Sequence, residues 1–302
     1  MPAERRYGMD HDHYDWSPIV ARPRLSWPEG KPLALCVLIV LDHYEWRPPE
    51  GTWQLKRPSG GLFPLPYPDY VRLSHREYGA RVGVFRLLDV LEQHGVPATV
   101  TLDALTAERT PWLVRHLLDR GVELIGHGQA GSRMITERMS AEDERTYLAE
   151  SIAAFTQAVG RPPRGWYGPE GNESSRTPEL LAEAGLDYVC DWVNDEQPYP
   201  MRSGLVSLPL LLETDDEFAL AQRRVSAPRW ARVVADTAEV LRRDGADNGR
   251  LLVLGLRPWL SGQPFRSVHL DRALGEVMGA GGVWAARGGE IVDWFRGRGP
   301  GR

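Results

Sequence analysis

The sequence has few lysines and cysteines, and it lacks a hydrophobic run long enough to cross a membrane. Lys31 and Lys56 are the only lysines among 36 basic residues, so few groups could form a Schiff base. Cys36 and Cys190 lie in apolar stretches, which excludes a disulfide framework and a cysteine-based zinc site. No apolar run approaches the roughly 20 residues of a membrane helix, and the start MPAERRYGMDHDHYDW has no signal-peptide core. We therefore expect a cytoplasmic protein that does not bind membranes.

The chain also lacks a cluster of basic residues. Its formal net charge is −5 over 302 residues, and its arginines are scattered. This pattern gives no electrostatic footprint for phosphate backbones, so nucleic acid is not an expected partner. With 42 % hydrophobic and 25 % charged residues, the composition is typical of a soluble globular protein.

Apolar runs that end at turn residues alternate with helical patterns along the chain. We expect strands at 33–41, 98–102, 122–125, 165–167, 186–190, 205–212 and 251–256, and helices at 75–94, 111–120, 140–159, 177–185, 228–244 and 264–278, with a last short α/β unit ending near 296. This order predicts an α/β fold, a distorted (β/α) barrel of seven or eight parallel strands. An open doubly wound sheet is the alternative, but no G-x-G-x-x-G motif follows the first strand.

The alternation continues without a repeat or a low-complexity linker, which predicts one domain over residues 1–302. Residues 1–31 form an N-terminal extension that is expected to pack on it. Residues 46–74 are irregular and rich in proline, glycine and aromatics, and we expect them to cover the mouth of the barrel.

Chemically versatile side chains follow several predicted strands. In parallel α/β folds the active site forms at the carboxyl ends of the strands. A carboxylate, an imidazole and a guanidinium at one mouth supply a general base, a general acid and an oxyanion-binding cation. We therefore predict catalytic roles for Asp42, His127, Glu170 and Arg257. For Arg257, the alternative is a structural ion pair with Asp191 or Glu170.

Other polar and aromatic residues lie at the same strand ends and could contact a substrate. Flat aromatic faces line sugar and heterocycle pockets, although the 11 tryptophans could equally fill the core. The predicted substrate-binding residues are Glu45, Trp46, Trp166, Tyr167, Glu173, Asp191, Trp192 and Trp259. His11 and His13 have a metal-like spacing but lie in a polar segment, and the remaining histidines, His75, His94, His116 and His269, fall in helical patterns.

The strand-end residues and their surroundings resemble the polysaccharide deacetylase superfamily, carbohydrate esterase family four, and in particular its allantoinase-like cytosolic branch. The resemblance rests on YDWSPIVARPRLSWPEGKPLAL, HREYGARVGVFRLLDVLEQHGVPATV, VELIGHG, GWYGPEGNESSRTPELLAEAGLDYVCDWVNDEQPY and LRPWLSGQPFRSVHLDRAL, which together cover most of the chain. It implies a distorted (β/α) barrel that hydrolyses a non-peptide C–N bond, usually of an N-acetyl group, with a divalent metal that polarises the carbonyl. It also implies assembly into a homo-oligomer.

The family motifs are only partly matched. Asp42 and His43 stand where the family has a catalytic base and a ligand carboxylate, and Asp191–Trp192 match its fourth motif. His127 matches the first histidine of a pair spaced by four, but Gly131 stands at the second position. Tyr167 replaces the arginine of the third motif, and Arg257 replaces a late histidine.

Two cofactor predictions follow from these differences. One divalent, zinc-like metal could be held by His43, His127 and Asp42, or the site could work without a metal. In the metal-free alternative Asp42 or Glu170 is the base, His127 moves the proton and Arg257 binds the oxyanion.

The sequence thus predicts an enzyme, a hydrolase of an amide, cyclic amide or N-acyl group in a small cytosolic metabolite. The alternatives are a non-hydrolytic enzyme that catalyses dehydration, elimination or cyclisation, and a degenerate barrel kept as a binding subunit.

Overall fold

A single curled sheet forms the centre of the molecule, in which the computed structural model describes residues 8–52 and 69–297. The strand order is β6-β7-β5-β4-β3-β2-β1-β8, with β9 also paired to β1. Every pairing is parallel except that of β6 with β7. The strands are β1 (Leu33–Ile39), β2 (Ala98–Leu102), β3 (Glu123–Gly126), β4 (Gly165–Trp166), β5 (Tyr188–Val189), β6 (Tyr199–Pro200), β7 (Val206–Ser207), β8 (Arg250–Leu256) and β9 (Val283–Ala285).

The sheet curls towards closure. Beyond β7, Leu210 forms a parallel bridge with Val253 of β8, which brings the two ends of the strand order together. The predicted distorted (β/α) barrel is therefore confirmed.

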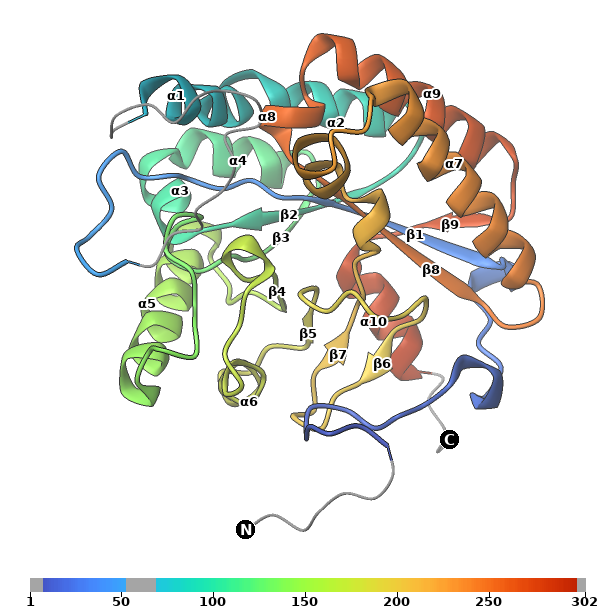
Figure 1. Cartoon of the computed structure of the whole chain (residues 1–302), viewed down its shortest axis with the longest axis horizontal. Helices are drawn as coiled ribbons and strands as arrows, with labels where there is room; N and C mark the ends of the chain where they lie inside the picture. The colour runs from blue at the N-terminus through green and yellow to red at the C-terminus, as the bar shows by residue number, and fades with distance from the viewer. Residues whose placement is uncertain (1–7, 53–68, 298–302) are drawn as a thin grey trace.

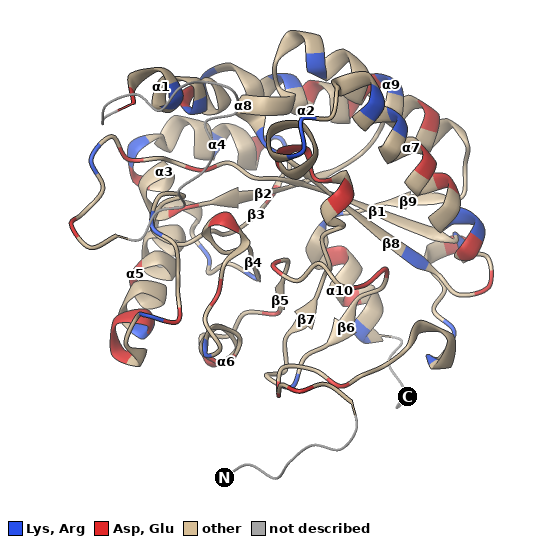
Figure 2. Ribbon diagram, viewed as in Figure 1, with Lys and Arg blue, Asp and Glu red and all other residues tan. Residues whose placement is uncertain are grey.

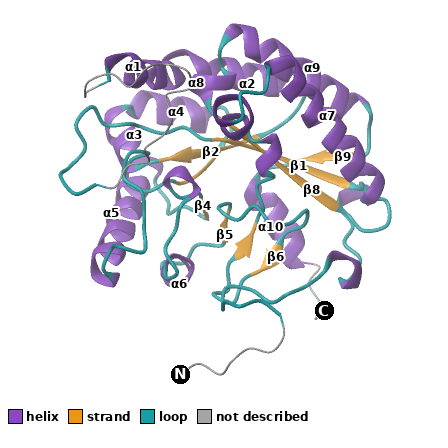
Figure 3. Cartoon of the chain, viewed as in Figure 1, coloured by secondary structure: helices purple, strands orange, loops and turns teal. Residues whose placement is uncertain are grey.

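Helices lie outside the strands, as Figure 3 shows. Figure 1 shows α1, α2, α7, α8 and α9 grouped over one side of β1, β2 and β8, while α10 lies on the other side. The helices are α1 (Tyr70–Tyr78), α2 (Val84–Gln93), α3 (Ala104–Arg109), α4 (Pro111–Asp119), α5 (Ala141–Val159), α6 (Thr177–Glu183), α7 (Ala227–Asp244), α8 (Pro258–Ser261), α9 (Pro264–Gly279) and α10 (Gly288–Gly297).

The alternation of side chains along β1 divides the core into two layers. Successive residues of a strand point to opposite faces. Leu33, Leu35, Val37 and Ile39 pack with the outer helices, whereas the residues between them join a second cluster with Trp27 and α10. All seven residues of β1 are buried, as expected for a strand covered on both faces.

Several predicted elements differ from the structure. The helix predicted at 75–94 begins earlier, at Tyr70, and a π-helical turn at Gly79–Gly83 separates α1 from α2. The prediction that 46–74 is irregular is thus wrong from Tyr70 onward, where α1 begins. Residues 53–68 of that segment lie outside the described residues. The strand predicted at 205–212 is reduced to two residues. Helix α3 was not predicted; the Asp103 side chain caps it by accepting from the Thr106 amide.

The N-terminal segment packs along the strand region in its described part. The Trp27 indole donates to the Arg250 carbonyl at 2.6 Å, and the rings of His13 and Tyr14 contact Trp192.

Basic and acidic residues are interspersed on α7 and α9 (Figure 2). Among the described helices, none is both long and apolar enough to cross a membrane.

Candidate active site

The carboxyl ends of the strands surround one buried guanidinium, that of Arg76 on α1. Its Nη1 lies 3.6 Å from Asp42 Oδ2, directly beyond β1. Its Nη2 lies 3.8 Å from Glu170 Oε1 and 3.4 Å from Glu217 Oε1. The Arg76 side chain is only 10 % exposed, so the Asp42 and Glu217 carboxylates compensate a charge that burial disfavours. The structure therefore brings Asp42 and Glu170 to the same cation, as expected for two residues predicted to be catalytic.

Two aromatic rings hold the plane of this guanidinium. The Arg76 Cζ lies 3.7 Å from the centroid of the Tyr44 ring and 4.8 Å from that of Trp259. Both distances are within the range of cation–π attraction. Of the predicted substrate-binding tryptophans, Trp259 is thus placed beside the catalytic carboxyls.

Arg257, the second buried guanidinium, is committed to the acidic run that follows β7. Its Nη1 donates a short hydrogen bond to Asp215, and its Nε lies 3.1 Å from Glu217 Oε2. Its Nη2 donates to the Tyr167 hydroxyl at 3.2 Å. Burial opposes the charge of Arg257, but Asp215, Tyr167, Glu217 and Asp216 together outweigh that effect, so the pKa of Arg257 is raised. Arg257 thus forms the ion pair that was the alternative to oxyanion binding, with Asp215 and Glu217 as partners instead of Asp191 or Glu170.

Glu170 lies on a tight loop in a conformation that side chains rarely adopt. Its φ is 61° and its ψ is 20°, within the sequence Pro169–Glu170–Gly171. Burial, followed by the nearby charge of Asp42, raises the pKa of Glu170 to about 8. Strained backbone conformations cluster at functional sites because the surrounding structure must enforce them. A carboxyl that keeps its proton at neutral pH is suited to act as a general acid.

His127 follows β3 and presents one nitrogen with no internal partner. Its Nδ1 lies 2.5 Å from the Tyr167 carbonyl oxygen, and its ring stacks on that of Tyr167. Because a carbonyl only accepts, Nδ1 carries the proton and Nε2 is an acceptor. Nε2 is buried without a hydrogen-bond partner among the described residues, and burial lowers the pKa of His127. The neutral ring is therefore prepared to accept a proton or hydrogen bond.

Glu173 and Asp191 form a buried carboxyl pair behind the Glu170 loop. Asp191 Oδ1 accepts from the Gly168 amide at 2.7 Å, which fixes the start of that loop. Burial and the charge of Asp191 raise the pKa of Glu173 well above its usual value, so the pair shares a proton that Glu173 carries. Both were predicted to bind substrate. Substrate binding by this pair stays a prediction, while the contact of Asp191 with Gly168 positions the Glu170 loop.

Asp103, which follows β2, positions the loop after β1. It accepts from the His43 amide at 2.6 Å and from the Thr106 hydroxyl at 3.0 Å. Burial raises the pKa of Asp103 to about 8 despite these hydrogen bonds. The carboxyl therefore anchors the backbone beside Asp42.

The predicted metal ligands are not assembled into a metal site. Among residues 8–52 and 69–297, no three histidine, cysteine, aspartate or glutamate side chains are arranged to hold a metal ion. At Gly131, a Cβ atom would lie 2.6 Å from Tyr44 Cε2 and 2.9 Å from Asp42 Oδ2, so the position has no room for a ligand side chain. The predicted ligand set of His43, His127 and Asp42 therefore does not fit a divalent metal ion.

Four other predicted substrate-binding residues have structural contacts. Trp166 is fully buried in the core, so its predicted contact with substrate is wrong. Glu45 is engaged by Arg133 at 2.6 Å and by Ser132. Trp46 donates to Glu77, and Trp192 packs against the N-terminal segment. Of the predicted aromatics, Tyr167 therefore lies beside Arg257 and His127, and Trp259 lies beside Arg76.

Arg76 and the acidic run 215–217 are site residues that the sequence prediction missed. The run follows the predicted strand 205–212, so the same rule that selected Asp42 would have selected it. Arg76 lies in a helical pattern, where an arginine is usually exposed, and no pattern in the sequence distinguishes it.

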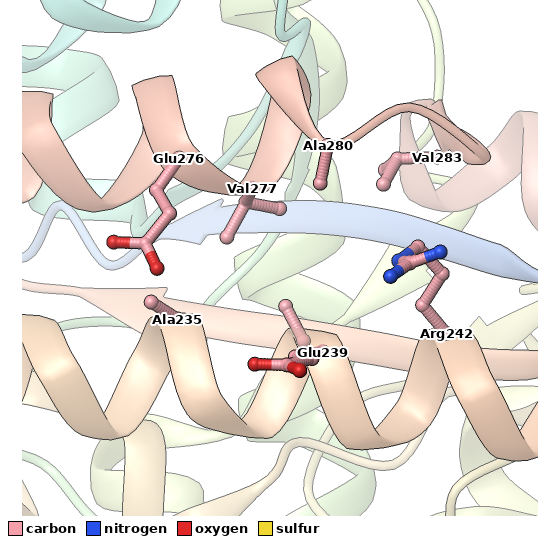
Figure 4. Close-up of a pocket in the computed structure, with 8 residues that line it drawn as sticks. Ala235, Glu239, Arg242, Glu276, Val277, Ala280 and Val283 are labelled. Atoms are coloured by element: carbon pink, nitrogen blue, oxygen red, sulfur yellow. The ribbon is translucent and has the colours of Figure 1, made fainter.

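A pocket of about 100 Å³ lies elsewhere, between α7 and α9. Ala235, Glu239, Arg242 and Glu276 line it, as Figure 4 shows. None of the catalytic candidates reaches this cavity, and it is not part of the site.

Comparisons with known proteins give consistent results. The Polysaccharide deacetylase family model matches residues 77–189. A Schizosaccharomyces pombe (strain 972 / ATCC 24843) protein named as a polysaccharide deacetylase is 27 % identical over 268 residues, 80 % of this chain and 82 % of that protein. The structure of a Pseudomonas aeruginosa PAO1 protein named as a probable polysaccharide deacetylase has a TM-score of 0.83 at 26 % identity, covering 93 % of this chain and 96 % of that one. The structure of the Puue allantoinase has a TM-score of 0.85 at 25 % identity, covering 99 % and 100 %.

Proposed function

We propose that the chain hydrolyses the C–N bond of an amide, cyclic amide or N-acyl group in a small molecule, because its residues 77–189 match the Polysaccharide deacetylase family model. The observation that carries this proposal is the placement of Asp42 and Glu170 on opposite arms of the Arg76 guanidinium. An ion-paired carboxylate and a carboxyl that holds its proton are the base and the acid that amide hydrolysis needs. The similarity to an allantoinase over its whole length supports a small substrate rather than a polymer.

In this mechanism Asp42 removes a proton from the attacking water, and the Glu170 carboxyl protonates the departing nitrogen. His127 Nε2 accepts a hydrogen bond from the substrate or the water, which would satisfy its buried lone pair. Arg257 keeps the run 215–217 in place and positions Tyr167.

An isotope experiment tests the reaction type. The purified full-length protein is incubated in ¹⁸O water with a panel of N-acyl sugars, ureides and cyclic imides. Hydrolysis adds water to the substrate mass and places one ¹⁸O atom in the released carboxylate. A product with no added water and no label would instead favour elimination, dehydration or cyclisation, and the absence of turnover across the panel would count against this function.

The protonation of Glu170 predicts a characteristic pH profile. Since burial raises the pKa of Glu170 to about 8, kcat should fall as the pH rises through that value. Ionisation of this buried carboxyl also destabilises the fold. The free energy of unfolding should therefore fall as the pH rises from the pKa of Glu170 in the unfolded chain, near 4.5, to its pKa in the folded protein, about 8. Glu170→Gln should therefore remove the alkaline decrease in kcat and be more stable than the wild type at pH 9, by a few kcal/mol, but not at pH 4.

The chain provides a matched control for this variant. Pro28–Glu29–Gly30 repeats the same tripeptide with nearly the same backbone, φ 59° and ψ 20° at Glu29, but this side chain is 78 % exposed. Glu29→Gln should leave both the pH profile and the stability unchanged. An alkaline decrease in kcat that persists in Glu170→Gln would refute the assignment of Glu170 as the acid.

A further inference from the structure

Arg76 is the better placed of the two buried guanidiniums to bind a substrate. Arg257 donates one short hydrogen bond and another of 3.2 Å to protein oxygens. The Arg76 nitrogens lie 3.4 to 3.8 Å from their carboxylates, beyond the roughly 2.7 to 2.9 Å of a full charge-assisted hydrogen bond. The Arg76 N–H groups therefore lie near these carboxyl groups but do not form short hydrogen bonds with them.

The aromatic rings and the carboxylates keep this cation in place in the absence of short hydrogen bonds. Tyr44 and Trp259 pack against its guanidinium, and the surrounding carboxylates balance its charge. A preorganised cation in a site shielded from water stabilises developing negative charge without further rearrangement.

Two alternatives for this task are excluded among the described residues. The ligand position at Gly131 is blocked, and Arg257 is committed to Asp215. Building on the hydrolase function proposed above, we propose that Arg76 binds the carbonyl oxygen of the scissile amide and stabilises the oxyanion, the task that a divalent metal performs in metallohydrolases.

The reaction then balances with water as the only co-reactant. The water oxygen bonds to the carbonyl carbon while a water proton passes to Asp42, and the C=O π pair moves onto the oxygen held by Arg76. When this intermediate collapses, the C–N bond breaks and the nitrogen takes a proton from Glu170. Proton transfer from Asp42 to Glu170 through solvent restores the starting state, with a carboxylic acid and an amine released.

Chemical rescue tests this role directly. Arg76→Ala should lower kcat at least about a hundredfold, with a much smaller change in KM, because the contact strengthens in the transition state. Free guanidinium at tens of millimolar should restore part of kcat, whereas equal concentrations of urea or sodium chloride should not. Arg72→Ala, one turn earlier on α1 and 39 % exposed, is the matched control and should behave as the wild type with and without guanidinium.

A binding measurement separates this proposal from the proposed function. The former carbonyl oxygen stays on the released acid, so Arg76 should also bind a simple carboxylate. Calorimetric titration with acetate should show at least tenfold weaker binding by Arg76→Met than by the wild type or Arg72→Met. Urea unfolding of each variant checks that the fold is retained.

The outcomes are distinct. If the wild type shows no hydrolysis of any substrate, and acetate binding still depends on Arg76, the hydrolase function fails and the Arg76 site stands. If the wild type is active and Arg76→Ala retains kcat within tenfold, the Arg76 role is overturned and the function stands. Acetate binding that does not differ between Arg76→Met and the wild type, or loss of kcat that guanidinium does not rescue in a folded variant, also overturns it.

Discussion

Replacing Asp42 by asparagine is expected to lower kcat/KM by about a thousandfold or more. The amide retains the size of the side chain but has no basic oxygen to accept a proton from water. Asp42 lies at the end of β1, whose seven residues are all buried, so the backbone beneath it should not move. Steady-state kinetics on the best substrate of the panel would measure the loss.

Two controls make the Asp42 result specific. Asp89→Asn changes the same functional group on α2, at a side chain that is 62 % exposed, and should leave kcat/KM unchanged. Denaturant unfolding should give nearly equal stabilities for both variants and the wild type. Activity of Asp42→Asn within tenfold of the wild type would show that another group removes the proton.

Replacing Arg257 by methionine should give the largest loss of stability, about 3 to 5 kcal/mol at pH 7. The substitution removes the buried cation that Asp215 and Glu217 face, so Asp215 loses its ion-pair partner and Glu217 keeps only part of its compensation. Burial already raises the pKa of Asp216 to about 7, so this acidic run has little tolerance for a lost positive charge.

The pH dependence of this loss has a definite sign. Without the cation, the buried carboxyls bind protons more tightly in the folded state, so acid protonates them and relieves their repulsion. The deficit measured by urea unfolding should therefore shrink between pH 7 and pH 5. Arg232→Met, which removes a surface arginine paired with Asp236 and Glu276, should leave the stability essentially unchanged. A deficit under about 1 kcal/mol for Arg257→Met would mean that the cluster is not stabilised by its charge pairs.

The sequence predicts the elements whose signal is local. The apolar run of β1 and the helical periodicity of α7 and α9 predict the barrel, and the strand-end rule places Asp42, His127 and Glu170 at one mouth. The resemblance in motifs also predicts the family, since it depends on residue identity rather than on contacts.

The remaining features depend on contacts between distant segments. Strands β4, β5 and β7 have two residues each, too few for a period to be recognised. Arg76 and Glu217 are 141 positions apart in the chain, and no local pattern indicates that they meet. Trp166 follows the strand-end pattern of a site residue, yet packing against Gly126 places it in the core.

Gly131 also has an evolutionary consequence. A single change of this glycine to histidine would not restore a pair of imidazoles, because the first carbon of the new side chain would collide with Tyr44 and Asp42. Tyr44 would have to shrink or turn away first, and that change would remove one of the rings that hold Arg76. A histidine at position 131 therefore requires a second change at Tyr44 before its imidazole can be accommodated.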